Sequence, residues 1–248
     1  MQKIIGKLKD KNLYISLLIT LVFFGIFAKI EFAADTYCTL ESTPSEMVSH
    51  FMSIGRFVIA IWQGGFFKLG FSFGFIYISS YILAILCITL SIYNLFLVIN
   101  KKINNGAICF LVSTVTIINP FTIELFLFIE KGIFGLTVLL TVLSFDKFVK
   151  YLDGDKKALK YVFIFMLIAT FCYQGIIGLF IALSTIYVVF YSKNAKEFIK
   201  NNVVLLLGYG IPAIINLLTI RLFFSSARVN GEINLVESLH KIIDGSVE

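Results

Sequence analysis

Charged residues are scarce in this 248-residue chain and nearly absent from its long apolar runs. They make up 15% of the sequence, against about 25% in a soluble domain. Hydrophobic residues make up 58%, and the mean hydropathy is +0.93. This composition excludes an ordinary soluble domain and indicates a polytopic membrane protein. The first run, Leu13 to Phe32, is long enough to span a bilayer. It lacks the small-residue cleavage site of a signal peptide, so we expect it to be retained.

Cysteine and histidine are also rare. Three of the four cysteines lie in apolar runs, where Cys behaves as a small hydrophobe, and there is no paired CxxC spacing. The two histidines are far apart in the sequence. The sequence therefore predicts neither a zinc site nor a disulfide framework.

The lysines fall in four blocks, at every second gap between the apolar runs: residues 3–11, 101–102, 147–160 and 193–200. Short loops rich in Lys and Arg stay in the cytoplasm. The pattern predicts about seven crossings with a cytoplasmic N-terminus, and it places 14 of the 21 Lys and Arg residues inside. Ten of the 15 acidic residues then lie outside. The basic excess is therefore a topology signal that matches anionic inner-leaflet lipid, and it does not indicate nucleic-acid binding.

We expect an all-α fold with a single membrane domain over residues 1–248. The predicted spans are near 13–32, 73–99, 106–118, from 120 or 126 to 145, two arms within 161–191, and 203–224. Residues 161–191 are ambiguous, because one helix of 31 residues would be about 46 Å long. A hairpin turning at Tyr173-Gln174-Gly175 keeps the last lysine block inside, so we favour the hairpin. The tail, 225–248, is then outside.

Residues 33–70 form the predicted outer segment. Thr43-Pro44-Ser45-Glu46 is a capping box with Pro at the first helical position, which predicts a helix start. Apolar residues then recur at three- and four-residue intervals, which predicts one amphipathic helix in the outer interface that ends at Gly64-Gly65. Asp35 precedes this helix, three residues past the first span. Partial desolvation there would make Asp35 a better proton acceptor, and an ordinary solvated loop acid is the alternative.

Four short motifs together resemble a known family. They are Ala33-Ala34-Asp35-Thr36-Tyr37, Gly55-Arg56-Phe57, Asn119-Pro120 followed by Glu124, and Tyr173-Gln174. Their order and spacing look like those of the GtrII-like glucosyltransferases of bacterial surface polysaccharide modification, which are membrane transferases of the GT-C type. Members often carry two adjacent acids where this chain has Asp35 alone, and they usually continue into further spans and a C-terminal outer domain. A short member, a truncated product and a partial reading frame remain alternatives for this chain.

The resemblance implies transfer of a hexosyl group from a polyprenyl-phosphate-linked donor to a surface polysaccharide such as O-antigen. It implies a bacterial inner-membrane protein with an outward-facing active site. The implied catalytic residues are Asp35, as general base, and Glu124; the implied phosphate ligands are Arg56 and Arg221; the implied substrate contacts are Tyr173, Gln174 and Lys131. For Glu124, compensation of a helix dipole is an alternative, and for Arg56, contact with lipid headgroups. No cofactor is predicted, and a divalent cation is possible in this class, although the dispersed outer acids do not establish a metal site.

Two other functions remain open. One is a transporter or flippase of a lipid-linked sugar, although such proteins usually place ionisable residues near the middle of the bilayer and often show repeated halves. This chain shows no repeat, and the interiors of its runs are almost free of charge. The other is a non-catalytic membrane protein, which the short length favours.

Overall fold

The computed structural model describes residues 10–29 and 41–224, and every regular element in these ranges is a helix. The elements are α2 (Lys11–Phe24), η1 (Gly25–Ala28), α4 (Pro44–Ser53), α5 (Phe57–Lys68), α6 (Phe73–Ile103), α7 (Gly106–Ile117), α8 (Pro120–Leu125), α9 (Lys131–Leu152), α10 (Ala158–Cys172), η2 (Gln174–Ile176), α11 (Ile177–Tyr191) and α12 (Ala195–Phe223). Within the described residues, five segments are long and apolar enough to cross a membrane: α2 with η1, α6, α9, η2 with α11, and α12. The all-α membrane fold is therefore supported. The other two predicted spans correspond to the shorter apolar helices α7 and α10.

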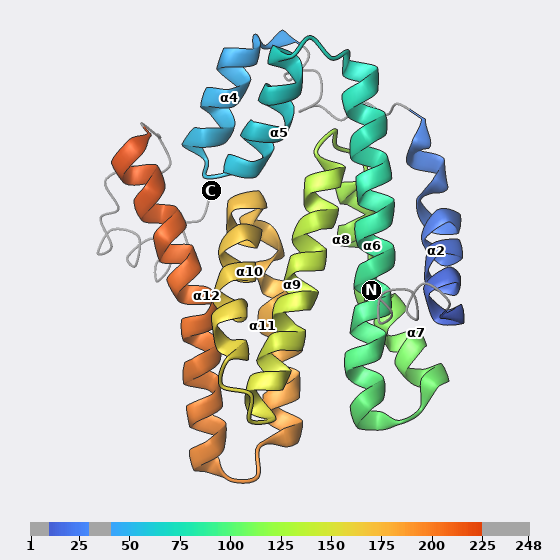
Figure 1. The fold of residues 1–248 in the computed structure, drawn as a ribbon, viewed down its shortest axis with the longest axis vertical. Coiled ribbons are helices and arrows are strands. Elements are labelled where there is room, and N and C mark those ends of the chain that lie inside the picture. Colours follow the sequence, from blue (N-terminus) through green and yellow to red (C-terminus); the bar gives the residue numbers. More distant parts are fainter. Residues whose placement is uncertain (1–9, 30–40, 225–248) are drawn as a thin grey trace, which may run out of the picture.

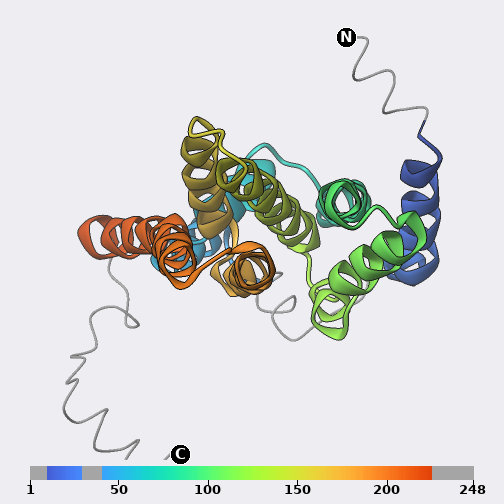
Figure 2. The same ribbon diagram turned by 90° about the horizontal axis from the view of Figure 1, so that it is seen from below.

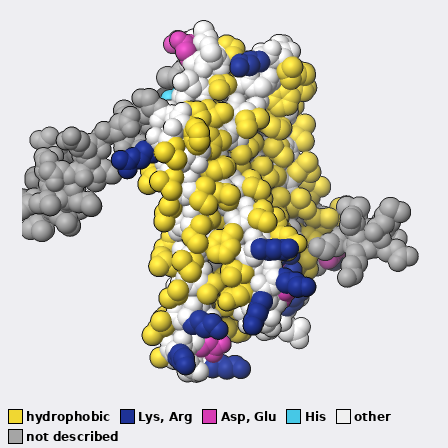
Figure 3. All heavy atoms as spheres, turned by 60° about the vertical axis from the view of Figure 1, so that its left-hand side comes forward, with side chains coloured by type: hydrophobic (Ala, Val, Ile, Leu, Met, Phe, Trp, Pro, Cys, Tyr) yellow, Lys and Arg dark blue, Asp and Glu magenta, His cyan; other side chains and the backbone are white. Residues whose placement is uncertain are grey.

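The long helices run up and down beside one another, while α4 and α5 form a hairpin across one end (Figure 1). Seen from below, the assembly is elongated rather than round (Figure 2). The loops α6–α7, α9–α10 and α11–α12 lie together at the end away from α4 and α5. We call this the lysine-rich end, because it carries the lysine blocks 101–102, 147–160 and 193–200. A broad hydrophobic surface separates the two ends, and most of the basic residues visible on that face gather at the lysine-rich end (Figure 3).

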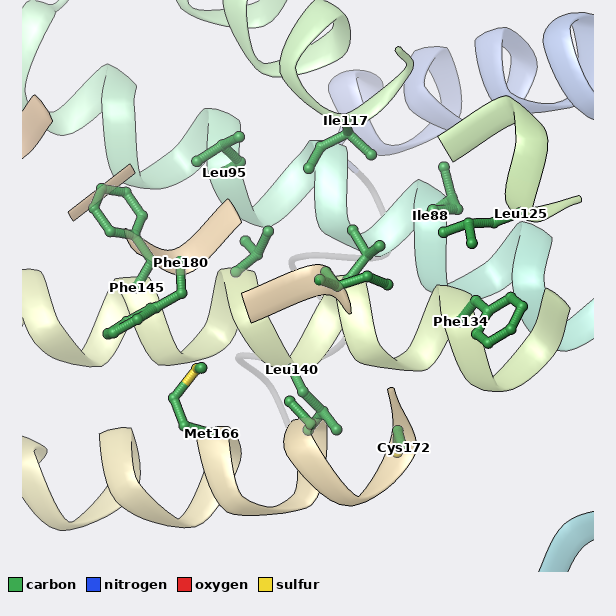
Figure 4. Close-up of a cluster of buried hydrophobic side chains, with 14 of the residues drawn as sticks. Ile88, Leu95, Ile117, Leu125, Phe134, Leu140, Phe145, Met166, Cys172 and Phe180 are labelled. Atoms are coloured by element: carbon green, nitrogen blue, oxygen red, sulfur yellow. The ribbon is translucent and has the colours of Figure 1, made fainter. Parts of the chain in front are cut away.

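Small residues allow α9 to pack closely on α6. A Cβ added at Gly132 would lie 2.7 Å from the Ser80 carbonyl oxygen, and one at Gly135 would lie 3.0 Å from the Ala84 Cα. The buried Ser80 hydroxyl joins the two helices, since it donates to the Ile129 carbonyl at 2.6 Å and accepts from the Gly132 N–H at 2.8 Å. Small side chains and interhelical hydrogen bonds are what hold helices together in lipid. Helix α9 also packs against α10 and α11 through large apolar side chains (Figure 4).

The predicted break within residues 161–191 is confirmed. Helix α10 ends at Cys172, Tyr173 is extended with φ −162°, and α11 follows the short η2. Tyr173 packs on Phe134 near the start of α9, whereas Tyr187 packs on Phe145 further along the same helix. The two arms therefore run in opposite directions, and α11 ends at the lysine-rich end.

The predicted outer helix is wrong in one respect, because it is two helices rather than one. Helix α4 begins at the expected capping box, with both reciprocal hydrogen bonds between Thr43 and Glu46. It ends at Ser53, and α5 starts at Phe57. Gly64 and Gly65 lie inside α5 and do not end it.

Two further boundaries also differ from the prediction. The fourth predicted span begins at Lys131, as α9, because Asn119 caps the separate helix α8, with its side-chain oxygen accepting from the Thr122 N–H. Helix α12 begins at Ala195 rather than Val203, because Asn194 caps it and the first two turns are polar. The last lysine block thus extends from the loop onto the start of α12.

Candidate functional site

The turn between α4 and α5 is the centre of the candidate site. Gly55 adopts φ +76°, which glycine reaches without the steric cost of a Cβ. The Gly55 N–H donates to the Met52 carbonyl at 3.1 Å and the Arg56 N–H to the Phe51 carbonyl at 2.9 Å. These are the two hydrogen bonds of a Schellman motif. The motif ends α4 sharply and places Arg56 at the start of α5.

Two amide side chains from distant parts of the chain hold this turn. The Gln174 Nε2 group donates to the carbonyl oxygens of Ile54 at 3.2 Å and Gly55 at 3.1 Å, and to the Asn216 Oδ1 atom at 3.1 Å. The Asn216 Nδ2 group donates to the same Gly55 carbonyl at 2.9 Å. The packing is close, since a Cβ at Gly55 would lie 2.6 Å from the Asn216 Oδ1 atom and 2.9 Å from the Gln174 Nε2 atom. The turn is therefore fixed to α12 and to the α10–α11 connection.

Arg56 is held by an aromatic ring. Its guanidinium carbon lies 4.7 Å from the centroid of the Tyr173 ring, within the range of a cation–π interaction. Tyr173 in turn packs on Phe134 with ring centroids 4.6 Å apart. Both side chains are partly exposed. The structure thus brings together Gly55-Arg56 and Tyr173-Gln174, two of the motifs behind the family resemblance.

A third motif lies beside them. Helix α8 and the residues before it face η2 and α9 across a cavity of about 270 Å³, whose lining includes Asn119, Thr122, Val138, Gly175 and Ile176. The cavity therefore places the Asn119-Pro120 segment next to the residues that directly follow Gln174. The polar atoms of Asn119 are engaged in local hydrogen bonds to the Thr122 N–H and the Thr116 carbonyl.

Lys131 is not a surface residue. It is fully buried at the start of α9, and its Nζ atom lies 3.8 Å from the centroid of the Tyr77 ring on α6. The Tyr77 hydroxyl donates to the Lys29 carbonyl at 2.7 Å. The buried Lys131 side chain lies one turn before Phe134 and contributes to the packing of α9 on α6, rather than offering an open contact to a substrate.

The remaining predicted site residues are not part of this cluster. Glu124 is exposed on α8 and does not line the cavity beside it, and Arg221 is exposed on the last turn of α12. Arg221 directly follows Ile220, whose side chain faces Gly55. Asp35 and residues 225–248 lie outside the described residues. No group of three or more His, Cys, Asp or Glu residues that could hold a metal ion occurs within the ranges 10–29 and 41–224.

Two buried amides were missed by sequence reasoning. Asn216 is 3% exposed and lies in the apolar run of α12, where an isolated amide is a signal for an interhelical hydrogen bond. Gln63 is fully buried on α5, seven residues after Arg56 and thus on the same helix face. Neither polar atom of its amide has a hydrogen-bond partner in the described part of the chain. Leaving an amide unsatisfied costs about 1–3 kcal/mol, which polar atoms of a ligand would offset.

Comparison of the chain with protein-family models, with curated proteins and with solved structures finds no match.

Proposed function

We propose that this protein is a membrane glycosyltransferase that moves a glucosyl or related hexosyl group from a polyprenyl-phosphate donor to a surface polysaccharide. The observation that supports this most is the fixed position of Arg56. The cation stacks on Tyr173 and follows a turn held by Gln174 and Asn216, at the end of the molecule opposite the lysine-rich end. Guanidinium binds phosphate oxygens in a bidentate manner, and a preorganised cation is what a leaving phosphate requires.

Helix α5, which begins directly after Arg56, fits a donor with a lipid tail. Helix α5 exposes Ile61 at 68%, and Leu69 is exposed at 76% beside the exposed Lys68. Apolar and basic side chains exposed together are typical of a helix lying at a membrane interface. In the proposed complex the phosphate binds Arg56 while the prenyl chain stays in the bilayer.

The proposed reaction is a displacement at the anomeric carbon. The oxygen of an acceptor hydroxyl forms the new glycosidic bond, the bond between the anomeric carbon and the phosphate oxygen breaks, and polyprenyl phosphate leaves with the bonding electron pair. Asp35 is the proposed base that takes the hydroxyl proton, an effect worth about 10²–10⁴ in rate. Arg56 stabilises the charge that develops on the phosphate.

The geometry revises the roles proposed for the other residues. Gln174 uses its amide N–H groups on the turn and on Asn216, so its proposed role is to position Arg56. Tyr173 positions the guanidinium by stacking. Glu124 and Arg221 remain proposed contacts to the sugar and the phosphate because both are exposed to solvent or headgroups. The buried Lys131 has a proposed structural role in the packing of α9 on α6.

The test is transfer from radiolabelled polyprenyl-phosphate glucose to surface polysaccharide in membrane vesicles. Asp35→Asn is expected to lower the rate by at least about 10²-fold, with unchanged expression. Arg56→Lys keeps the charge but loses bidentate binding and is expected to reduce transfer, and Arg56→Ala to reduce it further. Glu41→Gln is the control for Asp35, since Glu41 is an exposed acid in the same outer segment. Undiminished transfer by Asp35→Asn would refute the proposal, as would movement of the lipid between leaflets without transfer.

A further inference from the structure

A spacious apolar cavity lies near the lysine-rich end, far from Arg56. It measures about 510 Å³, within the range of ligand pockets, and it separates α11 from α6 and α7. Its walls are almost entirely apolar and include Val98, Ile103, Val112, Ile186 and Phe190. Four of these five, all but Val98, are exposed between 44% and 79%, so the cavity opens onto the hydrophobic surface of the bundle.

A charged cavity adjoins the apolar one. It measures about 240 Å³ and is lined by Val98, Lys101, Lys102, Asp146, Val149, Lys150 and Asp153. Val98 and Lys102 line both cavities, so the two are neighbours that share one wall. Three ammonium groups face two carboxylates in the charged cavity, which leaves it with a net positive charge.

Lys102 lies between the two cavities and lines both. Its Nζ atom lies 2.6 Å from the Asp153 Oδ1 atom, and 5.7 Å and 5.5 Å from the ring centroids of Tyr187 and Tyr191. The Tyr187 hydroxyl also donates to Asp153, at 3.4 Å. Lys102 thus links α6 to the ends of α9 and α11, with one side toward the apolar cavity and the other toward the charged one.

We propose that the two cavities form one binding site for an anionic phospholipid of the leaflet at the lysine-rich end. The phosphate lies in the charged cavity near Lys101, Lys102 and Lys150, and one acyl chain fills the apolar cavity between α11 and the α6–α7 hairpin. Charge complementarity supports this occupant, because the charged cavity has an excess of cations and a phosphate group supplies the missing anion. The apolar cavity opens where acyl chains would lie.

The bound lipid would hold the molecule together at this end. Helix α11 packs chiefly on α9 and α12, and the cavity separates it from α6 and α7. An acyl chain in this space supplies the missing packing, and a phosphate beside Lys102 adds a second link between α6 and α9. A ligand that binds only the folded state raises its stability. Because both cavities lie at the lysine-rich end, this lipid site is separate from the proposed transferase centre, and the proposal does not depend on the transferase function.

The experiment measures lipid binding to the purified full-length protein in neutral detergent by native mass spectrometry and thermal unfolding. The probe is phosphatidylglycerol, with phosphatidylcholine of the same acyl chains as the neutral comparison. We expect phosphatidylglycerol to bind and raise the unfolding temperature, and phosphatidylcholine to do so weakly. Lys102→Gln/Asp153→Asn leaves no lone charge behind and keeps the net charge of the charged cavity, so its effect measures the direct contact between Lys102 and the phosphate. Loss of this charge-assisted contact should weaken binding of phosphatidylglycerol by at least about tenfold.

Matched variants separate a defined site from diffuse attraction. Lys156→Gln removes an exposed lysine at the same end that lines neither cavity, and should weaken binding less than about fivefold. Ile186→Trp places a larger ring in the apolar cavity and should weaken binding, whereas Val189→Trp, on the same helix but outside the lining, should leave it unchanged. Equal losses for the Lys102 and Lys156 variants would overturn the proposal, and so would unchanged binding by Ile186→Trp. Binding of polyprenyl phosphate in place of phosphatidylglycerol would also overturn it.

Discussion

Replacing Gly55 by Ala tests whether the α4–α5 turn is as closely held as the structure shows. Alanine at φ +76° costs about 1–2 kcal/mol from the backbone alone. The new Cβ would also lie 2.6 Å from the Asn216 Oδ1 atom and 2.6 Å from the Ile220 Cδ1 atom. Overpacking of this kind costs about 1–3 kcal/mol. The expected loss in the free energy of unfolding is therefore about 2–5 kcal/mol.

Gly70→Ala is the matched control. Gly70 has φ +80°, and nothing lies within 4 Å of the position where its Cβ would be built. The backbone cost is thus shared by the two variants, and their difference of about 1–3 kcal/mol measures the close packing around Gly55. A further variant, Ile220→Val, removes the Cδ1 atom that the methyl group of alanine at position 55 would contact. Combined with Gly55→Ala it should cost less than the sum of the two single changes.

The assay is unfolding of the purified protein in mixed micelles with increasing denaturing detergent. Trp62 is the only tryptophan and lies on α5, so its fluorescence reports on the helix that follows the turn. The same variants are then tested for glucosyl transfer, where Gly55→Ala should lose activity because Arg56 moves with the turn, and Gly70→Ala should not. Equal destabilisation by the two alanines would refute the close packing. Full transfer activity of the Gly55→Ala variant would refute the proposal that the α4–α5 turn positions Arg56.

Three other residues give smaller, separable effects. Tyr173→Phe keeps the aromatic ring beside Arg56 and should keep most of the transfer activity. Tyr173→Leu loses a cation–π contact worth about 0.5–1 kcal/mol and should lower kcat/KM for transfer by about two- to fivefold. Ser80→Ala removes the hydroxyl partner of a buried N–H and a buried carbonyl and should cost about 1–3 kcal/mol in the unfolding assay. Ser79→Ala removes a hydroxyl that donates to the Ile76 carbonyl within the same helix, and it should cost less. The side-chain and backbone hydrogen bonds from Thr43 lower the pKa of Glu46 below its ordinary value of 4.5. The ionised carboxylate therefore stabilises α4 above that value, and this stability is lost as the pH falls through the folded-state pKa. The loss caused by Glu46→Gln should accordingly be present at neutral pH and shrink at acid pH.

Local sequence signals predicted the helix starts and breaks that depend on few residues. The capping box at Thr43 predicted the start of α4, and both of its hydrogen bonds are present. The hairpin at Tyr173 was predicted from the lysine pattern, because a single helix would have separated the last lysine block from the others. These features are set by nearby residues or by the charge of whole loops, so one sequence is sufficient to find them.

Features that depend on tertiary contacts were not predicted. The break at Gly55 was missed because apolar residues continue at helical spacing from Ile54 to Val58, whereas the glycine is required by the approach of Gln174 and Asn216. Periodicity cannot reveal a contact between residues 119 or 161 positions apart. The buried state of Lys131 was missed for the same reason, since it depends on packing against Tyr77 of α6.

The two proposed sites lie at opposite ends of the bundle, and this separation can be tested directly. Helix α6 has 31 residues and runs from one end to the other, a length of about 46 Å. Perturbations this far apart, with no shared partners, should be additive. We therefore expect Gly55→Ala to lower transfer and leave phosphatidylglycerol affinity unchanged, and Lys102→Gln/Asp153→Asn to do the reverse in lipid-saturated membranes. The triple variant should show both losses at their single-variant size. A loss of transfer that follows lipid affinity across these variants would show that the two ends are coupled through the helices, and the lipid would then be a regulator of the transferase rather than a structural ligand.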